Sequence, residues 1–405
     1  MGKPEKKGFA ELLRYSHMVS PEVMGLKDGG FLAGFWLTGP DLESSTVQEL
    51  EHMSDMMARA VNQLDVRWSI HFEFFRREAR SYPTGDFRET TTKLIDLERY
   101  MQFDREEGHF ESVQTMFVTY VPPGFEKSAV ARKLKKVILG SEHESEEVLV
   151  EKQLERFEEV LKGLKDSLSL IMKVRRMVFH PDEDNPYSGT SELLESVNAC
   201  VNGRWHPTRL PAFPYYLDCF LAKDCINGKF LDYDREYLQC VSLVNYPAGT
   251  FPSILSDLQT LPIAFRWSNR FLLTDMREAL SQIEKKRREW VQKIRSLVSQ
   301  ITGIQTTKVN QDAIAMVQDL DDALQDAHSG EVAFGNHTST VILRHTNPEV
   351  LESATREIVK VFERAGCNAR VERMNNLEAF LGSLPGHGYE NVRKPLTEPD
   401  RKSVV

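Results

Sequence analysis

The same order of expected elements occurs twice along this 405-residue sequence. In each half a β-hairpin is followed by a helix, a strand, a helical segment, a strand, a helix, a strand and a short helix. The hairpins turn at Gly29-Gly30 and at Asn227-Gly228, which tolerate the positive φ angles of tight turns. A repeated order of this length indicates duplication of one supersecondary unit. The sequence therefore predicts an α+β protein of two related units, each a mixed or antiparallel sheet with packed helices.

The expected bounds follow from this repeat. We place the first unit at residues 1–207, the second at 208–384, and a junction or tail at 385–405. The second unit is expected to contain a long antiparallel helical hairpin at about 275–328, because apolar side chains recur at helical spacing from Met276 to Ile301 and again from Ala313 to Ala327. "HPDEDNPYSGT" (180–190) is expected to be a loop and "SILSDLQTL" (253–261) a helix.

Composition narrows the class of protein. The net charge of −9 disfavours general binding to nucleic acid or anionic membranes. No apolar run approaches the roughly 20 residues of a membrane-spanning helix, and the N-terminus lacks the apolar core of a signal peptide. The cysteine number is odd and no CxxC occurs, so we expect reduced, mostly buried thiols in a cytoplasmic protein.

A search for catalytic motifs finds none. "SLPGHGYENVRKPL" (383–396) has the glycines and basic residues of a phosphate-binding loop, but no Gly-Lys-Ser/Thr follows. The patterns G-x-G-x-x-G, G-x-S-x-G and H-E-x-x-H are also absent from the sequence. We therefore predict no catalytic, cofactor-binding or metal-binding residue.

Two weaker candidates for a catalytic or metal-binding site remain. His71 and Glu73 alternate on an expected strand, so both side chains point to the same face of the sheet. They would suit a metal-ligand or acid/base pair. Alternatively, they simply belong to a solvated or interface face of the sheet. The acidic stretch His180–Pro186 would suit a cation, but its Asp and Asn residues beside Pro are equally typical of a turn.

Two basic stretches are candidate contact surfaces. Lys285, Lys286, Arg287 and Arg288 precede a Trp on the long helix and would suit a nucleic-acid strand, a protein partner or a solvated helix face. The segment 127–136, "KSAVARKLKK", would suit anionic lipid or, again, a solvated helix.

Two stretches resemble a known family. "FLGSLPGHGYENVRKPL" (380–396) is similar to the segment that precedes the motor domain in the TrbE/CagE/VirB family of conjugal-transfer ATPases of type IV secretion systems. "YSHMVSPEVMGLKDGGFLAGFWLTGPDLESST" (15–46) resembles the opening of TrbE-type proteins. On this resemblance the C-terminal segment is a domain junction, with these residues as its markers: Pro385, Gly386, Gly388, Asn391 and Arg393.

The resemblance implies a role in docking and assembly. The family's P-loop, Mg-binding carboxylate and arginine finger lie in a RecA-like motor domain whose motifs this sequence does not match, so ATP and Mg are expected only for that domain. The implied partners are inner-membrane subunits of the secretion channel and further copies of the chain, at the cytoplasmic face of the membrane and without a membrane span. Two alternatives stay open. The chain is one piece of a split ATPase that works with a motor domain in cis or trans, or it contacts DNA through Lys285 to Arg288, although its acidity makes nucleic acid an unlikely partner.

Overall fold

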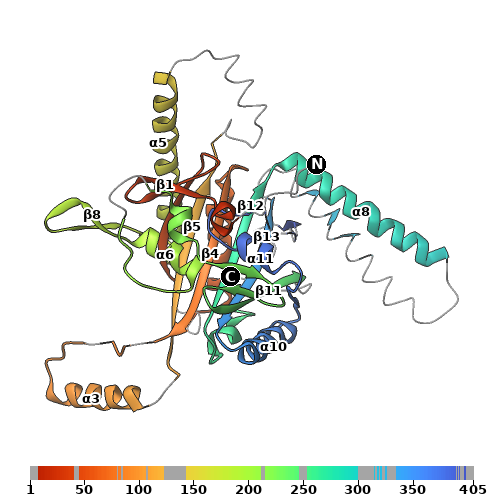
Figure 1. Cartoon of the computed structure of the whole chain (residues 1–405). Coiled ribbons are helices and arrows are strands. Elements are labelled where there is room, and N and C mark those ends of the chain that lie inside the picture. The colour runs from red at the N-terminus through yellow and green to blue at the C-terminus, as the bar shows by residue number, and fades with distance from the viewer. Residues whose placement is uncertain are drawn as a thin grey trace.

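One antiparallel sheet forms the centre of the molecule (Figure 1). In this computed structural model the described residues are 8–40, 45–79, 81–83, 85–105, 108–122, 143–210, 215–245, 253–299 and 334–388, together with 314, 317, 318, 320, 321, 324, 325, 390, 392, 396 and 397. The sheet has 13 strands within this part of the chain. The first half contributes β1 (Tyr15–Ser20), β2 (Val23–Leu26), β3 (Phe31–Thr38), β4 (Trp68–Glu78), β5 (Phe110–Tyr120) and β6 (Lys173–Arg176). The second half contributes β9 (Cys225–Asn227), β10 (Leu231–Tyr233), β11 (Glu236–Asn245), β12 (Phe265–Thr274), β13 (Phe334–His345), β14 (Asn368–Val371) and β15 (Leu396–Thr397).

The strand order of the two halves is mirrored about the sheet centre. The order is β1-β2-β3-β5-β4 and then β12-β13-β11-β10-β9, with β6 on β3 and β14 on β11. β4 and β12 join the halves in an antiparallel ladder that runs from Phe265 opposite Arg76 to Leu272 opposite Ser69. The expected α+β class is confirmed, and the sheets expected for the two units are joined edge to edge into one. This pairing satisfies the backbone groups that two separate edge strands would leave open. The domain bounds remain a prediction.

Helices cover both faces of the sheet. Their bounds are α1 (Phe9–Leu12), α2 (Val47–Asn62), α3 (Thr90–Arg105), α5 (His143–Leu168), α6 (Glu192–Asn202), α7 (Leu217–Leu221), the 3₁₀ turn η1 (Ser256–Thr260), α8 (Met276–Ser299), α10 (Pro348–Arg364) and α11 (Asn376–Gly382). On one face, α2 and α5 pack on the first half of the sheet, and α10 with η1 packs on the second half. On the other face, α1, α6, α7 and α11 share one apolar core with strands from both halves.

The ends of several helices follow from local sequence. Thr46 caps α2 in a capping box with Glu49, and Ser191 caps α6 by accepting from the backbone N–H of Leu194. α6 ends at Gly203, whose φ of +70° suits a residue without a side chain. Asn347 caps α10 by accepting from the backbone N–H of Glu349. These caps fix where the covering helices begin, and so which residues they turn toward the sheet.

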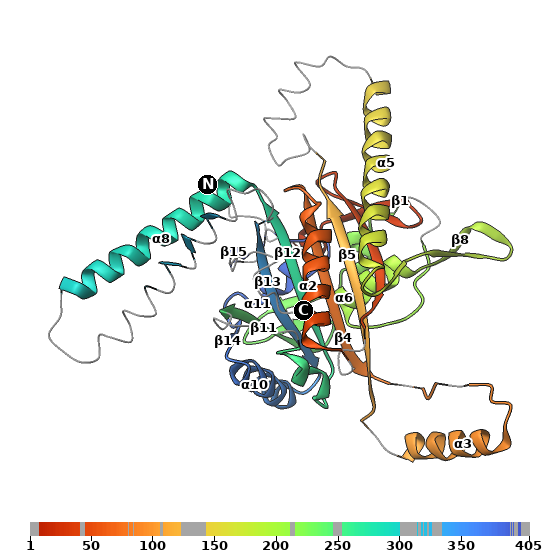
Figure 2. The same cartoon turned by 180° about the vertical axis from the view of Figure 1, so that it is seen from behind.

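The helices α3 and α8 and a two-stranded ribbon extend away from the body in both views (Figures 1 and 2). The ribbon pairs β7 (Phe179–Asp182) with β8 (Asn185–Ser191). The second limb of the predicted helical hairpin is described only at a few helical residues. Leu320 and Leu324 among them pack beside Ile283 of α8, which agrees with the expected pairing.

Other expectations differ from the structure. The stretch 180–190 is not a loop but mostly belongs to the β7–β8 ribbon, because Gly189 lets the strands approach closely: a Cβ there would lie 2.1 Å from the carbonyl oxygen of His180. The helix expected at 253–261 is only the turn η1. The basic segment 127–136 lies outside the described residues. No described helix has the length and apolarity that crossing a membrane requires.

Candidate functional site

The segment from Gly382 to Gly388, at the end of α11, is buried against the centre of the sheet. It contains three of the five predicted junction residues: Pro385, Gly386 and Gly388 are all buried. Asn391 and Arg393 lie outside the described residues. Gly386 has a φ of +78°, and a Cβ there would lie 3.1 Å from the Leu26 side chain. A glycine is therefore required where the chain turns onto β2.

The N-terminal end of the sheet binds this segment directly. The Tyr15 hydroxyl donates to the carbonyl of Pro385 at 2.8 Å. Arg14 donates from Nη1 to the carbonyl of Gly386 at 2.7 Å, and from its backbone N–H to Nε2 of His387 at 3.1 Å. Residues about 370 positions apart are thus held together.

Two buried arginines of β12 bind the same segment from the sheet centre. Arg266 Nη1 donates to Glu73 Oε2 and to the Ser383 carbonyl, each at 3.0 Å. Arg270 Nη1 donates to the Gly382 carbonyl at 2.7 Å. These carbonyls belong to the C-terminal end of α11, where a helix leaves acceptors unsatisfied and favours positive charge. The two guanidinium groups therefore cap α11 from inside the protein.

Cross-strand pairing places the partners of these arginines. In the β4–β12 register, Glu73 lies opposite Ser268 and His71 opposite Arg270. Ser268 Oγ donates to Glu73 Oε1 at 2.7 Å. His71 and Glu73 are both buried, so the interpretation of this pair as a solvated face is wrong. Because both carboxylate oxygens of Glu73 accept hydrogen bonds from β12, its geometry suits an internal ion pair.

Burial dominates the electrostatics of this cluster. It raises the pKa of Glu73 to about 7, although Arg266 and Ser268 act in the opposite direction. It lowers the pKa of Arg270 to about 10. Burial, with Arg270 beside it, also holds the pKa of His71 well below its usual value, so the ring is neutral at pH 7. The cluster therefore has the composition of a structural clamp, and no group of three or more His, Cys, Asp or Glu suited to a metal occurs among the described residues.

The thiols mostly follow expectation. Cys200, Cys240 and Cys367 are buried, Cys225 is partly exposed and Cys219 is exposed, all as free thiols. Burial raises the pKa of Cys240 to about 12, which keeps this thiol protonated and unreactive.

The basic patch of residues 285–288 lies on the projecting helix α8. Lys285, Lys286 and Arg288 are exposed, and Arg287 pairs with Asp321 at 2.5 Å. One of the four charges is therefore used within the chain, next to the apolar contact of α8 with Leu320 and Leu324. The rest of the patch lies on an exposed helix face, which leaves its role a prediction.

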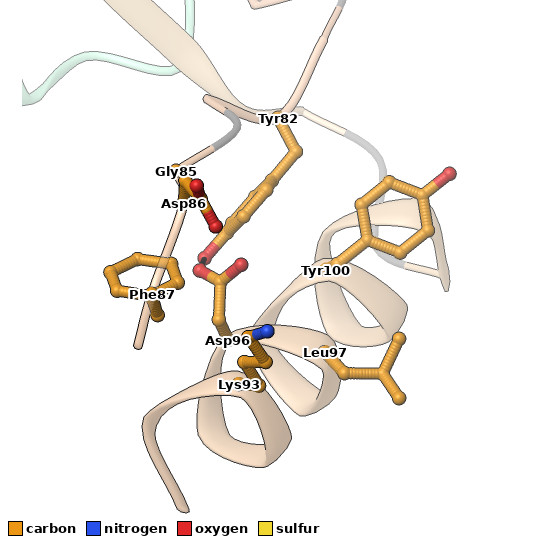
Figure 3. A pocket seen from close by; sticks show the side chains of 8 residues that line it. All are labelled: Tyr82, Gly85, Asp86, Phe87, Lys93, Asp96, Leu97 and Tyr100. Atoms are coloured by element: carbon orange, nitrogen blue, oxygen red, sulfur yellow. Dashed lines mark hydrogen bonds between the residues drawn. The ribbon is translucent and has the colours of Figure 1, made fainter. Parts of the chain in front are cut away.

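A shallow cavity lies beside α3 (Figure 3). It measures about 270 Å³ and is lined by Tyr82, Gly85, Asp86, Phe87, Lys93, Asp96, Leu97 and Tyr100. The Tyr82 hydroxyl donates to Asp96 Oδ1 at 2.8 Å, and its ring packs edge-on against Tyr100. The loop before α3 thus covers only one side of the helix.

Two protein-family models match the sequence of this chain. The model described as "type IV secretion system ATPase VirB4/TrbE, N-terminal domain" matches residues 22–128. The model described as "CagE, TrbE, VirB family, component of type IV transporter system" matches residues 184–393, which is more than half of the chain. The chain belongs to the CagE/TrbE/VirB family. The suggested family is confirmed, and the clamped segment 382–388 lies inside the second match.

Individual relatives carry the TrbE name. The conjugal transfer protein TrbE of Rhizobium radiobacter is 32% identical over 394 residues, which is 96% of this chain and 48% of that protein. Two proteins of Sinorhizobium fredii also match, and their names give them as two separate pieces of a probable conjugal transfer protein TrbE. The piece named second is 38% identical over 205 residues, which is 51% of this chain and 31% of that protein. The piece named first is 37% identical over 124 residues, which is 30% of this chain and 83% of that protein. The chain spans about half the length of the Rhizobium relative.

Sequence reasoning missed the arginine clamp and the exposure of α3. A signal for the clamp was present in "FRWSNRF" (265–271), where Arg266, Ser268 and Arg270 fall on one face of the strand and Phe265, Trp267, Asn269 and Phe271 on the other. On a strand in the middle of a sheet that face is covered, so the charges must be paired inside. That β12 is central was not visible from the sequence alone.

Proposed function

We propose that this chain is the docking and assembly region of a type IV secretion ATPase in conjugal transfer. Family membership supports the system, and the exposed apolar surface of α3 supports the assembly role. Five large apolar side chains of this helix are each about half exposed or more. Exposed apolar patches on a protein with a well-covered core typically mark interaction sites.

In this proposal the chain lies at the cytoplasmic face of the inner membrane. It contacts inner-membrane subunits of the secretion channel and other copies of itself. ATP and Mg bind only to the motor domain. The arginine clamp supports the proposal, because it holds the segment that precedes the motor domain in the family firmly to the sheet. Movement of a motor attached there would reach the docking region through a fixed contact.

Fractionation of cells tests the docking role. The tagged chain is produced with and without the other components of its secretion system, and membranes are separated by flotation. We expect recovery with the inner membrane only when those components are present. Equal recovery in both strains, or no recovery in either, contradicts docking on channel subunits. ATP turnover by the purified chain contradicts the assignment of catalysis to the motor domain alone.

A second function is favoured by the two Sinorhizobium relatives, whose names divide TrbE into separate pieces. These names support the existence of TrbE proteins in pieces, so we also propose that the chain serves as one component of a split ATPase. A purified motor domain from the same system would then bind the chain in trans and hydrolyse ATP faster with it. No complex and no change in turnover would contradict this function while leaving membrane docking intact.

A further inference from the structure

Helix α3 buries none of its side chains. Five of its six large apolar residues are exposed by 47–62%: Leu94, Ile95, Leu97, Tyr100 and Met101. Leu94, Leu97 and Met101 are spaced i, i+3 and i+7, so they form one stripe along the helix. We call these three residues the α3 stripe. The loop that carries Tyr82 and Phe87 covers a different side of the helix, as Figure 3 shows for Tyr82, Asp96 and Tyr100.

The equivalent insertion in the other half of the sheet is covered. α3 lies between β4 and β5, and α8 lies between β12 and β13, which hold matching places in the mirrored strand order. On α8, Ile283 is only 3% exposed because Leu320 and Leu324 pack beside it. Within the described part of the chain, no buried core residue belongs to α3. An apolar stripe along a helix is normally buried against another element.

The charges on α3 indicate what covers it. The whole chain carries −9, but the 16 residues of α3 carry three basic and three acidic side chains. A second copy therefore meets no net repulsion at this helix. Lys93 and Asp104 lie on the same flank of the stripe, Lys93 one residue before its first member and Asp104 three residues after its last, so both are equally far from a point between residues 98 and 99. In an antiparallel pair of helices such residues face each other across the interface, twice by symmetry.

We propose that α3 is a self-association surface, where the stripe packs antiparallel against the stripe of a second copy. This rests on the proposed function, because it names the contact behind the self-association expected there. In the pair, Lys93 of each copy faces Asp104 of the other, and Leu97 lies near the two-fold axis. The cavity beside Leu97 and Tyr100 gives the other copy's apolar side chains room to enter. Since α3 is only about 24 Å long, the contact is smaller than the roughly 1,200 Å² of stable complexes. The dimer is therefore weak and concentration-dependent.

Sedimentation over a range of concentrations tests the surface. The double variant Leu94→Glu/Leu97→Glu should weaken dimerisation at least tenfold, because it places like charges across the two-fold axis. Gln102→Glu is the matched control, since it adds the same side chain to the same helix outside the stripe. Equal dimerisation by the double variant and the unaltered chain overturns the proposal, and so does a chain that is monomeric at every concentration.

Cysteine cross-linking tests the antiparallel geometry. In a Cys219→Ser background, which removes the exposed thiol, Leu97→Cys should form a disulfide between copies under mild oxidation. Gln102→Cys should not, because its counterpart lies more than a helical turn away. Cross-linking at Gln102→Cys but not at Leu97→Cys overturns the geometry.

Flotation of the double variant separates this proposal from the proposed function. Normal membrane recovery with lost dimerisation supports both. If membrane recovery is lost while the dimer persists, the occupant of α3 is a channel subunit rather than a second copy, and the self-association proposal fails while docking stands.

Discussion

The ion pair between Glu73 and Arg266 makes a quantitative prediction about stability. The two side chains are 0% and 6% exposed and meet at 3.0 Å. Arg266→Met leaves Glu73 buried with only Ser268 as a donor, and removes the arginine donor to the Ser383 carbonyl. Breaking a buried pair from one side costs about 3–5 kcal/mol of unfolding free energy. Glu73→Leu should cost a similar amount, because it leaves a buried guanidinium without its counter-ion.

The double variant separates the charge effect from the packing effect. Glu73→Leu/Arg266→Met removes both charges, and the Ser268 hydroxyl, no longer needed by Glu73, can donate to the Ser383 carbonyl. We therefore expect it to cost about 1–2 kcal/mol, less than either single change, because a buried ion pair adds little over apolar side chains of similar volume. Urea unfolding followed by tryptophan fluorescence provides the measurement, provided the denaturant dependence stays the same among variants.

A surface pair supplies the control for this cycle. Lys360 and Glu357 lie 2.7 Å apart with side chains about half exposed. Lys360→Met should change stability by less than about 1 kcal/mol. If both single changes at the buried pair also cost less than about 1 kcal/mol, or if the double variant costs their sum, the reasoning that this pair clamps α11 is refuted.

Further measurements test other regions of the structure. Burial lowers the pKa of His337 to about 4. The contribution of this residue to stability is therefore present above the unfolded pKa of 6.5 and is lost as pH falls toward 4. In His337→Phe the melting temperature should depend less on pH over that range. The raised pKa of Glu73 acts with the opposite sign, since its contribution is lost as pH rises from 4.5 to about 7. Gly189→Ala should destabilise by about 1–3 kcal/mol because its Cβ meets the His180 carbonyl, whereas Gly163→Ala on exposed α5 backbone should stabilise by about 0.5–1 kcal/mol. Single-stranded DNA should not be retained by the chain even at low salt, and retention that Lys285→Glu removes would contradict this.

Local patterns predicted most elements, but not how the halves combine. Periodicity was sufficient for α5, where Phe157, Leu161 and Leu164 are buried as their spacing predicts. It was insufficient for β7 and β8, because a two-stranded ribbon with prolines and acidic residues has the composition of a loop. It could not reveal the β4–β12 pairing, since strand partners distant in sequence leave no local signal. The clamp depends on that pairing, so Arg266 and Arg270 could not be assigned a role beforehand.

The β4–β12 ladder has a consequence for a cut between the two halves of this chain. Both strands lie at the sheet centre, and each of their faces is covered by helices or apolar core. A break between residues 176 and 225, after β6 and before β9, would give two pieces, each ending its sheet on a long strand rich in apolar residues. Such strands aggregate unless they find a partner. The pieces would therefore be unsuited to independent folding and well suited to fragment complementation, in which β4 and β12 recognise each other as a newly formed sheet centre.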